Sequence, residues 1–541
     1  MTRSRLRRSA RRVATLIAAV SAFSASASAQ VASAPRGWSS VTAGSDEELY
    51  LRILQNSGAL PATGWASRPL SNVVLDSARR HIGTTHPWQS RFAADTAKPH
   101  TVLQWRGAAF SGSWNSAFPW GGNDGALWQG RGANALLTSG FLLRFKALTL
   151  RAEPQFVYSE NTAFDPLPTV VSAAVSPYVD RMRPAAIDLP ERFGTRPQQR
   201  LDAGESELRI EEHGFAASFS NRVLFLGPAF RNPLILGPNA PGFAHLAFGT
   251  TDGIRTPIGQ FSGTVVYARL AQSAFAPDKR DGSRLGSAVV ISWRPPSGKG
   301  VELGAVRFYH RDWPSDGLKF GDLKIPFGSL FGDREVAGTA APDNQLLSLF
   351  ARAVSTKMQL ELFAEFGRND RSGGLRDLEV EPEHNSAWSA GFLKSVGLAE
   401  SGHFWTTRVE YLNGRITSLQ RFRPQSTFYE HATITQGHTN LGQVLGSPLL
   451  ERTGGFEIAV DRWGHAGKIG GMLQQRLMPI TGGESVSTID ARSQWALSLN
   501  GNYLKGLSNL GWRAGVVRDF NRTLGHDASN FFIGTDVSFG R

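Results

Sequence analysis

Two absences in this 541-residue sequence narrow its class: it has no cysteine, and it has no long apolar run beyond its N-terminus. Without cysteine, the disulfides on which small exported domains commonly rely are excluded. After residue 29, no window reaches the roughly 18–20 apolar residues of a membrane-spanning helix. The chain is therefore either soluble or crosses a membrane as strands, and a closed hydrogen-bond ladder would then stabilise it without disulfides.

The sequence also lacks a dense block of lysine and arginine of the kind that binds nucleic acid. Its formal net charge is +13, and six of these charges are arginines among the first twelve residues, which leaves +7 for the remainder. We therefore expect no nucleic-acid partner. A mildly basic chain of this kind favours acidic sugars.

Those six arginines begin an N-terminal export signal. An apolar stretch follows at residues 13–23, and residues 27–29 form a small-x-small site, Ala-Ser-Ala, that places cleavage before Gln30. The apolar stretch is too short to span a bilayer, so the layout is typical of a secretory signal peptide over residues 1–29. The arginines are Arg3, Arg5, Arg7, Arg8, Arg11 and Arg12.

Residues 30–100 form a helical region. Ser45 is a candidate N-cap, and Glu48 three residues later completes a capping box. Gly58 is expected to end this first helix, and a second short helix is expected to begin at Ser71.

From residue 101 to residue 541 the hydrophobic period is two, which predicts β-strands. The alternation is clearest at residues 357–366, 405–411 and 495–503, and residues 141–152 read as a hairpin. About 440 residues, at 9–11 residues per strand plus connections, allow roughly 14–20 strands. Long inserts that read as surface loops occur at 154–205, 310–342, 367–386 and 413–452.

The polar face of these strands carries charges such as Lys357, Glu361 and Glu365, so we expect that face to be wet. Several apolar faces end in an aromatic residue: Phe366, Tyr411 and Tyr503. A polar lumen, an apolar outer band and aromatic girdles are typical of a transmembrane β-barrel. A soluble sandwich explains the alternation as well, but its apolar faces would have to cover one another.

Signatures of catalysis are scarce. The sequence has no G-x-S-x-G, P-loop or H-E-x-x-H motif. Glu361 and Glu365 lie four apart on one strand, about 13 Å between Cα atoms, which is too far for a retaining glycosidase pair. His431 and His438 share a loop but have no third ligand at metal spacing. We therefore expect no enzyme activity, no metal and no cofactor.

Residues 428–446 combine aromatic, imidazole, amide and hydroxyl groups with several glycines. Such groups suit sugars, whose hydroxyl rims need donors and acceptors and whose C–H faces stack on rings. The same composition also fits an ordered structural plug, and the residues alone leave both interpretations open.

Five segments, in order, resemble the Wzi family of capsule assembly proteins. Residues 429–446 are similar to its Y-x-H and Q-G-Y/H region, and residues 302–307 to its E-L-G-A-S-R strand. Residues 343–346, Asp-Asn-Gln-Leu, match its D-N-Q-L strand start. Residues 226–236 are similar to its strand and loop around Gly-Pro, and residues 46–70 to its helical N-terminus.

The resemblance implies a monomeric, all-β barrel of about 18 antiparallel strands in the bacterial outer membrane, with a periplasmic helical region and lipid around it. The implied function is lectin-like binding of capsular polysaccharide or exopolysaccharide. The implied groups near the ligand, or closing the pore, are Tyr429, His431, Gln436, His438 and Asn440, and the candidate lumen charges are Arg307, Arg408 and Glu410. The family's paired tryptophans are replaced by residues 225–226, Phe-Leu, and this departure concerns the identity of the recognised sugar rather than the architecture.

Two other classes remain open. A passive porin would use the same strands around an open lumen. An outer-membrane enzyme would need a compact nucleophile or carboxylate constellation, which no spacing in the sequence provides.

Overall fold

The computed structural model describes most of the chain. The described residues are 41–81, 88, 101–167, 178–180, 186–276, 282–296, 300–327, 343–369, 379–397, 402–416, 425–478, 492–506, 508–523 and 526–539. The predicted signal peptide and part of the predicted helical region 30–100 lie outside them. Within the described ranges, no helix has the length and apolarity needed to cross a bilayer.

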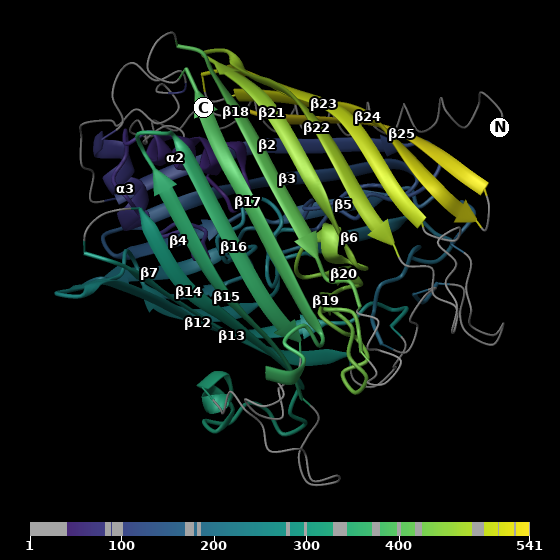
Figure 1. Cartoon of the computed structure of the whole chain (residues 1–541), viewed down its shortest axis with the longest axis horizontal. Coiled ribbons are helices and arrows are strands. Elements are labelled where there is room, and N and C mark those ends of the chain that lie inside the picture. The colour runs from purple at the N-terminus through teal and green to yellow at the C-terminus, as the bar shows by residue number, and fades with distance from the viewer. Residues whose placement is uncertain are drawn as a thin grey trace.

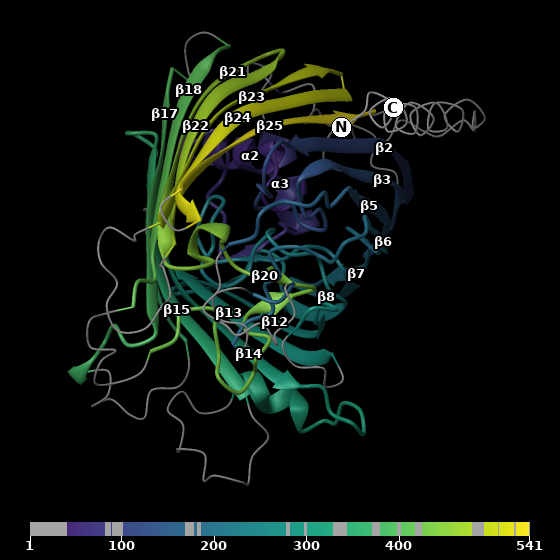
Figure 2. The same cartoon turned by 90° about the vertical axis from the view of Figure 1, so that its right-hand side faces the viewer.

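The strands build one closed antiparallel barrel (Figures 1 and 2). Its strand segments are β2 (Thr101–Asn115), β3 (Gly132–Phe145), β4 (Leu148–Ala152), β5 (Gln155–Ser159), β6 (Gln198–Asp202), β7 (Glu207–Glu212), β8 (Phe215–Ser220), β10 (His245–Thr250), β11 (Ile254–Thr256), β12 (Gly259–Ala271), β13 (Ser283–Arg294), β14 (Val301–Asp312), β15 (Asp343–Ser355), β16 (Leu360–Asn369), β17 (Ser386–Val396), β18 (Phe404–Asn413), β21 (Gly454–Gly464), β22 (Gly467–Met478), β23 (Arg492–Lys505), β24 (Ser508–Thr523) and β25 (His526–Ser538).

Some of these segments are halves of one interrupted strand. β4 and β5 both pair with β3 and together make one strand. β6 pairs with β5 and β7 pairs with β4, so β6 and β7 make the next strand. β10 and β11 both pair with β12 and make a third interrupted strand. Neighbours in sequence pair throughout, and β2 pairs with β25 to close the ring. The barrel therefore has 18 antiparallel strands, which confirms the predicted fold class and strand number.

The predicted alternation sets the two faces of the wall. On β16, Leu362 and Phe366 are 48% and 40% exposed on the outside, whereas Glu361, Phe363 and Glu365 point inward and are buried. A residue period of two gives each strand one apolar outer face and one inner face. The expectation of a wet inner face is wrong, however, because the lumen is filled by folded chain.

The N-terminal segment is one part of that filling. The helices α2 (Asp46–Asn56) and α3 (Asn72–His81) lie inside the ring of strands (Figure 2). As predicted, the Ser45 hydroxyl caps α2 by accepting from the Glu48 amide at 3.2 Å. Ser71 caps α3 in the same way, accepting from the Val74 amide at 3.2 Å.

Buried charges attach α2 to the barrel wall. Arg52 donates from Nε to Glu361 at 2.9 Å and from Nη1 to the Ala229 carbonyl at 3.0 Å. Arg352 on β15 donates to the same Glu361 at 2.5 Å. A carboxylate between two guanidinium groups satisfies a charge that would otherwise be costly to bury. The inner charges of the wall thus bind the plug instead of water.

Two further segments complete the plug. Residues 221–244, between β8 and β10, turn inward, and β9 (Phe225–Leu226) within them pairs with β1 (Ser67–Arg68). Residues 425–453, between β18 and β21, fold over them and carry the short hairpin of β19 (Thr439–Asn440) and β20 (Gln443–Val444). Together these segments form an apolar core with the inner wall.

The two ends of the barrel differ in their connections. Short turns such as 146–147, 213–214 and 465–466 join strands at the end that holds α2 and α3. The predicted insert 154–205 is narrower than expected, because β5 and β6 occupy its ends. The inward segment 221–244 was not predicted as an insert, since its apolar residues resemble a strand.

Candidate functional site

The loop predicted to bind ligand is folded into the lumen. Tyr429 has no exposed surface, and its hydroxyl donates to the Leu234 carbonyl at 2.7 Å and accepts from the Ser447 amide at 2.9 Å. Burial raises the pKa of this phenol above its ordinary value. Tyr429 therefore links the loop to the inward segment 221–244 as a neutral hydrogen-bonding group.

His438 lies in a chain of hydrogen bonds between the loop and the wall. Its Nε2 contacts the Ile235 carbonyl at 2.5 Å, so this nitrogen carries the proton and donates. Its Nδ1 then accepts from Nε2 of His310 at 2.7 Å, and His310 accepts in turn from Arg284 at 3.4 Å. Burial lowers the pKa of His438 to about 3, with Arg284 acting in the same direction. This imidazole is neutral and buried.

The remaining loop residues of the predicted site also contact protein. The Gln436 amide donates to Gln272 at 2.8 Å. Asn440 donates to the Pro241 carbonyl at 3.2 Å and accepts from the Ala271 amide at 2.9 Å. His431 is half-buried, and its Nδ1 accepts from the Ile434 amide at 3.0 Å. The structure thus brings these residues together as the inside of a plug, and their contact with a ligand stays a prediction.

Two of the predicted charges point into the lumen. Glu410 is fully buried and accepts from the Phe230 amide at 2.7 Å and from the Asn232 side chain at 2.8 Å. Arg408 donates to Glu457 at 3.2 Å. Both are held by groups of the wall and the plug.

Arg307 corrects the sequence interpretation. Val306, Phe308 and His310 point into the core, where Phe308 lies 5.1 Å from the His438 ring. Since side chains alternate along a strand, Arg307 points to the outer face. The lumen charge that the family resemblance implied here is wrong, because the register of β14 places Val306 and Phe308 inside and therefore Arg307 outside.

A pocket that the sequence did not reveal lies at the end of the barrel opposite α2 and α3. It encloses about 160 Å³ and is bordered by residues from the inserts after β2, β5, β8 and β18 and from β22, β23 and β24. We call it the outer pocket. Its polar and aromatic lining includes Trp120, Asp124, Trp128, Gln129, Asp180, Glu191, Asn239, Gln443, Glu451, Arg452, Arg476, Arg492, Gln494 and Arg522.

Indole rings and arginines shape this pocket. The guanidinium of Arg476 lies 4.1 Å from the Trp120 ring centroid and donates to the Gly121 carbonyl at 2.5 Å. Trp128 is half-buried and meets Phe193 edge-on at 4.9 Å between ring centroids. A flat apolar ring surrounded by donors and acceptors is the arrangement that sugars need.

The other arginines of the pocket are paired. Arg492 donates to Asp519 at 2.8 and 2.6 Å, and Arg522 donates to Asp519 at 3.0 Å and to Glu191 at 2.9 Å. Arg452 pairs with Asp180. Such pairs order the lining in advance, which lowers the entropic cost of ordering on binding.

The outer pocket shares its floor with the predicted loop. Gln443 donates to the Asn239 carbonyl at 2.9 Å, and Asn239 donates back to the Val444 carbonyl at 2.9 Å. One signal in the sequence was available but unused: residues 118–131 combine two tryptophans with glycine, asparagine and aspartate, as the 428–446 loop combines its own ring and amide groups.

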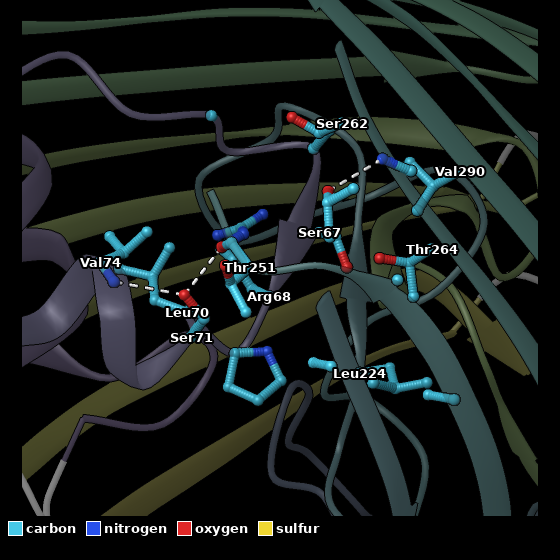
Figure 3. Close-up of a pocket in the computed structure, with 18 of the residues that line it drawn as sticks. Ser67, Arg68, Leu70, Ser71, Val74, Leu224, Thr251, Ser262, Thr264 and Val290 are labelled. Atoms are coloured by element: carbon cyan, nitrogen blue, oxygen red, sulfur yellow. Dashed lines mark hydrogen bonds between the residues drawn. The ribbon is translucent and has the colours of Figure 1, made fainter. Parts of the chain in front are cut away.

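A second polar space of about 90 Å³ lies at the α2 and α3 end. We call it the inner pocket. Figure 3 shows Ser71 and Val74 of the N-terminal segment on one side of this pocket and Ser262 and Thr264 of β12 on the other. The Ser71 hydroxyl donates to the carbonyl of Thr251, which follows β10, at 2.7 Å.

An apolar layer separates the two pockets. Leu189 and Val444 border the outer pocket, Leu224 and Val290 border the inner one, and all four belong to one buried cluster. Between them lie apolar residues of the plug: Leu234, Ile235, Leu236, Leu445, Leu449 and Leu450. Among the residues that the structure describes, the lumen is filled rather than open.

A closed 18-stranded barrel with a folded plug places the chain in the class of barrels with the outer-membrane architecture. No protein-family model and no curated protein matches the sequence. Among solved structures, the chain is similar to Wzi of Escherichia coli, an outer-membrane protein involved in group 1 capsule assembly and described as a carbohydrate-binding β-barrel. That match has a TM-score of 0.61 at 12% identity and covers 93% of this chain and 99% of Wzi.

Barrels of another kind also match. Pseudomonas aeruginosa OpdL matches with a TM-score of 0.38 at 10% identity over 81% of this chain and 98% of OpdL, and Acinetobacter baumannii OccAB2 with 0.39 at 8% over 80% and 97%. The resemblance to Wzi suggested by the sequence is thus confirmed at the level of the fold.

Proposed function

We propose that this protein binds capsular polysaccharide or exopolysaccharide at the bacterial surface and holds it there without chemical change. The observation that carries the proposal is the outer pocket, an indole- and arginine-lined cavity above a filled lumen. The fold shared with a carbohydrate-binding barrel supports it.

The chemistry of the lining explains how sugar would bind. Trp128, half-buried at the pocket wall, would stack on the C–H face of a sugar ring, and the amides of Gln129 and Gln443 would bind hydroxyl groups. Each such contact is weak. A repeating polymer presents many copies, so its effective concentration raises the overall affinity.

The proposal includes an orientation in the outer membrane. Outer-membrane barrels have short periplasmic turns and long extracellular loops. The short turns and the helical region 30–100 would therefore face the periplasm, and the outer pocket would face the cell exterior. The signal peptide expected over residues 1–29 would deliver the chain there, as a monomer surrounded by lipid.

A polysaccharide-binding assay tests the proposal. We expect the purified protein to bind the host's surface polysaccharide, and W128A or R476Q to weaken that binding about tenfold, which corresponds to ~1.4 kcal/mol. W405A is the matched control, because Trp405 is 51% exposed on the outer wall of β18, away from the pocket. Equal binding by W128A, R476Q and the wild type would contradict the site.

The passive porin is the alternative. A filled lumen should give no large steady conductance in a planar bilayer, whereas a porin conducts steadily. A large steady conductance of the wild-type protein would overturn the proposal of a plugged binding protein.

An enzyme acting on sugar is disfavoured by the pairing in the outer pocket. Glu191 and Asp180 are engaged by Arg522 and Arg452. Such partners hold a carboxylate in place, and a general acid needs to exchange its proton. Release of labelled sugar fragments by the pure protein would refute this.

A further inference from the structure

The outer wall of the barrel carries a folded segment that the binding of polysaccharide does not use. Residues 313–327 leave the end of β14 and include the short helix η2 (Asp322–Phe327). We call residues 313–327 the flap. Figure 1 shows it as a short teal segment below β12 and β13.

The flap covers a polar cluster on the outer face. Arg307 and Tyr309 of β14 and Gln345 of β15 point outward, yet their exposed fractions are only 8%, 1% and 2%. Arg307 donates to Gln345 at 2.9 Å and to the Pro326 carbonyl of the flap at 3.5 Å. An arginine open to lipid would be costly, so the flap and its partners screen this charge.

Hydrogen bonds and ion pairs hold the flap in place. The Tyr267 hydroxyl on β12 donates to the Leu323 carbonyl at 2.7 Å. Arg311 on β14 pairs with Asp322 at 3.3 Å, and the Lys319 amide donates to the same Asp322 at 2.8 Å. The attachment spans β12 to β14, so the flap is a fixed part of the wall and not a free loop.

The exposed side of the flap combines large apolar side chains with charged ones. Phe320 is 90% exposed and Phe327 63%, with Leu318 and Leu323 beside them in the sequence. Exposed aromatic side chains are expensive in water unless something covers them. Soluble surroundings therefore do not explain this surface.

The lipid-facing band of the barrel continues toward the flap. Ile291 on β13, Leu303 on β14 and Leu349 on β15 are 56%, 42% and 60% exposed on the same outer face. Arg307 comes after Leu303 on the outer face of β14, nearer the C-terminal end of the strand. The flap therefore begins where this apolar band ends. Lys319 and Lys324 of the flap and Arg269 of β12 provide cations at this level, and Lys319 forms an exposed ion pair with Asp316 of the flap.

We propose that the flap inserts Phe320, Phe327 and Leu318 among the acyl chains of the outer leaflet, with its lysines near the phosphates of an acylated, phosphorylated glycolipid. The partner follows from the continuity of the flap with the lipid-facing wall and from the combination of apolar edge and cations. The inference rests on the proposed location in an outer membrane.

The absence of cysteine makes the test direct, because any introduced cysteine is labelled alone. F320C carries a polarity-sensitive fluorophore in vesicles of phospholipid and lipopolysaccharide, with spin-labelled acyl chains as quencher. L349C on the outer wall is the positive control. A432C is the negative control, because Ala432 is an exposed residue of the plug loop.

We expect acyl-chain quenching of F320C to reach at least half that of L349C and to exceed that of A432C several-fold. Quenching of F320C as low as that of A432C, with L349C strongly quenched, would overturn the flap proposal and leave the membrane location standing. Failure of L349C to be quenched would overturn the membrane location itself. Shielding of F320C that depends on protein concentration and not on the quencher would identify a second copy as the occupant and also overturn the proposal.

The cations have their own readout. K319E combined with K324E should reduce quenching of F320C at least twofold in vesicles with lipopolysaccharide and leave L349C unchanged. Equal quenching in the double variant would contradict the role of the phosphates.

Discussion

At the scale of single residues, buried ionisable groups hold the plug to the wall. His438 is neutral because its surroundings exclude water and Arg284 lies nearby, and both effects disfavour the imidazolium. Glu361 is charged between Arg52 and Arg352. The folded state therefore favours the neutral imidazole of His438, whereas two guanidinium groups balance the negative charge of Glu361.

The first prediction concerns pH. His438 has a folded pKa of about 3 against an ordinary 6.5, so the unfolded chain binds this proton first as pH falls. Its contribution to stability is complete above pH 6.5 and decreases between pH 6.5 and 3, by about 1.4 kcal/mol per pH unit. Urea unfolding of H438Q should show a flatter dependence on pH in this window than the wild type.

The control for this measurement is H403Q, since His403 is exposed at the short-turn end. H403Q should keep the slope of the wild type. An H438Q slope equal to that of the wild type would contradict the buried neutral imidazole.

The second prediction concerns the buried ion pair. E361Q leaves the buried guanidinium of Arg52 without its carboxylate and Arg352 with Glu302 alone, and breaking a buried pair typically costs about 3–5 kcal/mol. Urea titration followed by tryptophan fluorescence measures the loss. K357Q in the exposed turn before β16 is the control and should change the free energy of unfolding by less than about 0.5 kcal/mol.

At the scale of elements, the inward segments decide what the barrel can do. Residues 221–244 and 425–453 meet through the hydroxyl of Tyr429 and the imidazole of His438. The loop also supplies Gln443 and Val444 to the outer pocket. Closing the lumen and forming the pocket are therefore two results of one folded loop.

The third prediction follows from that double role. Deletion of residues 428–446, bridged by glycine and serine, removes part of the apolar layer, including Val444 and Leu445, and part of the pocket floor. We expect a steady conductance in a planar bilayer where the wild type has none, together with loss of polysaccharide binding. Unchanged conductance would contradict this prediction and show that residues 221–244 and the N-terminal segment close the lumen without the loop.

Point variants of the loop refine this test. Y429A and H438A leave buried partners unsatisfied, at about 1–3 kcal/mol for each group, and should loosen the loop. If neither variant changes polysaccharide binding, the prediction that this loop takes part in the binding site is wrong.

At the scale of the whole molecule, closure of the ring is the source of stability. Pairing of β2 with β25 leaves the sheet without an edge, so no strand can fray from the ladder. This explains how a chain without cysteine can be stable without disulfides.

The fourth prediction tests closure. The folded protein should resist detergent at room temperature and migrate faster on a denaturing gel before boiling than after it. G534R, at a site where an added Cβ would lie 2.6 Å from Nε of Arg513 on β24 and 3.2 Å from the Gly112 carbonyl of β2, should disturb β25 against both neighbours and lower the temperature of that shift. G321R in the flap, where the backbone is not in the left-handed region and an added Cβ meets nothing within 4 Å, is the control.

The sequence predicted the wall much better than the lumen. The alternation at residues 357–366 correctly separated Leu362 from Glu361, because a strand has a period of two wherever it lies. The same alternation was read as a wet inner face, and Arg307 was assigned to the lumen. The first error arises because the pattern separates two faces but does not say what covers each. The second arises because the resemblance implied a lumen charge at Arg307, whereas the register of β14 places this side chain outside.

The outer pocket was missed for a related reason. Its lining comes from Trp120, Glu191, Asn239, Gln443 and Arg522, residues separated by up to 400 positions. No local spacing links them, and only closure of the barrel brings them to one end.

The sequence by itself determined the strands, the helix caps at Ser45 and Ser71, and the need for a closed ladder, since each depends on local chemistry and period. Tertiary structure alone decided that the lumen is filled, that the predicted loop is its plug, and that Arg307 lies beneath the flap. Those features depend on contacts between segments far apart in the chain, and the free energy of such contacts is not encoded in any short stretch of residues.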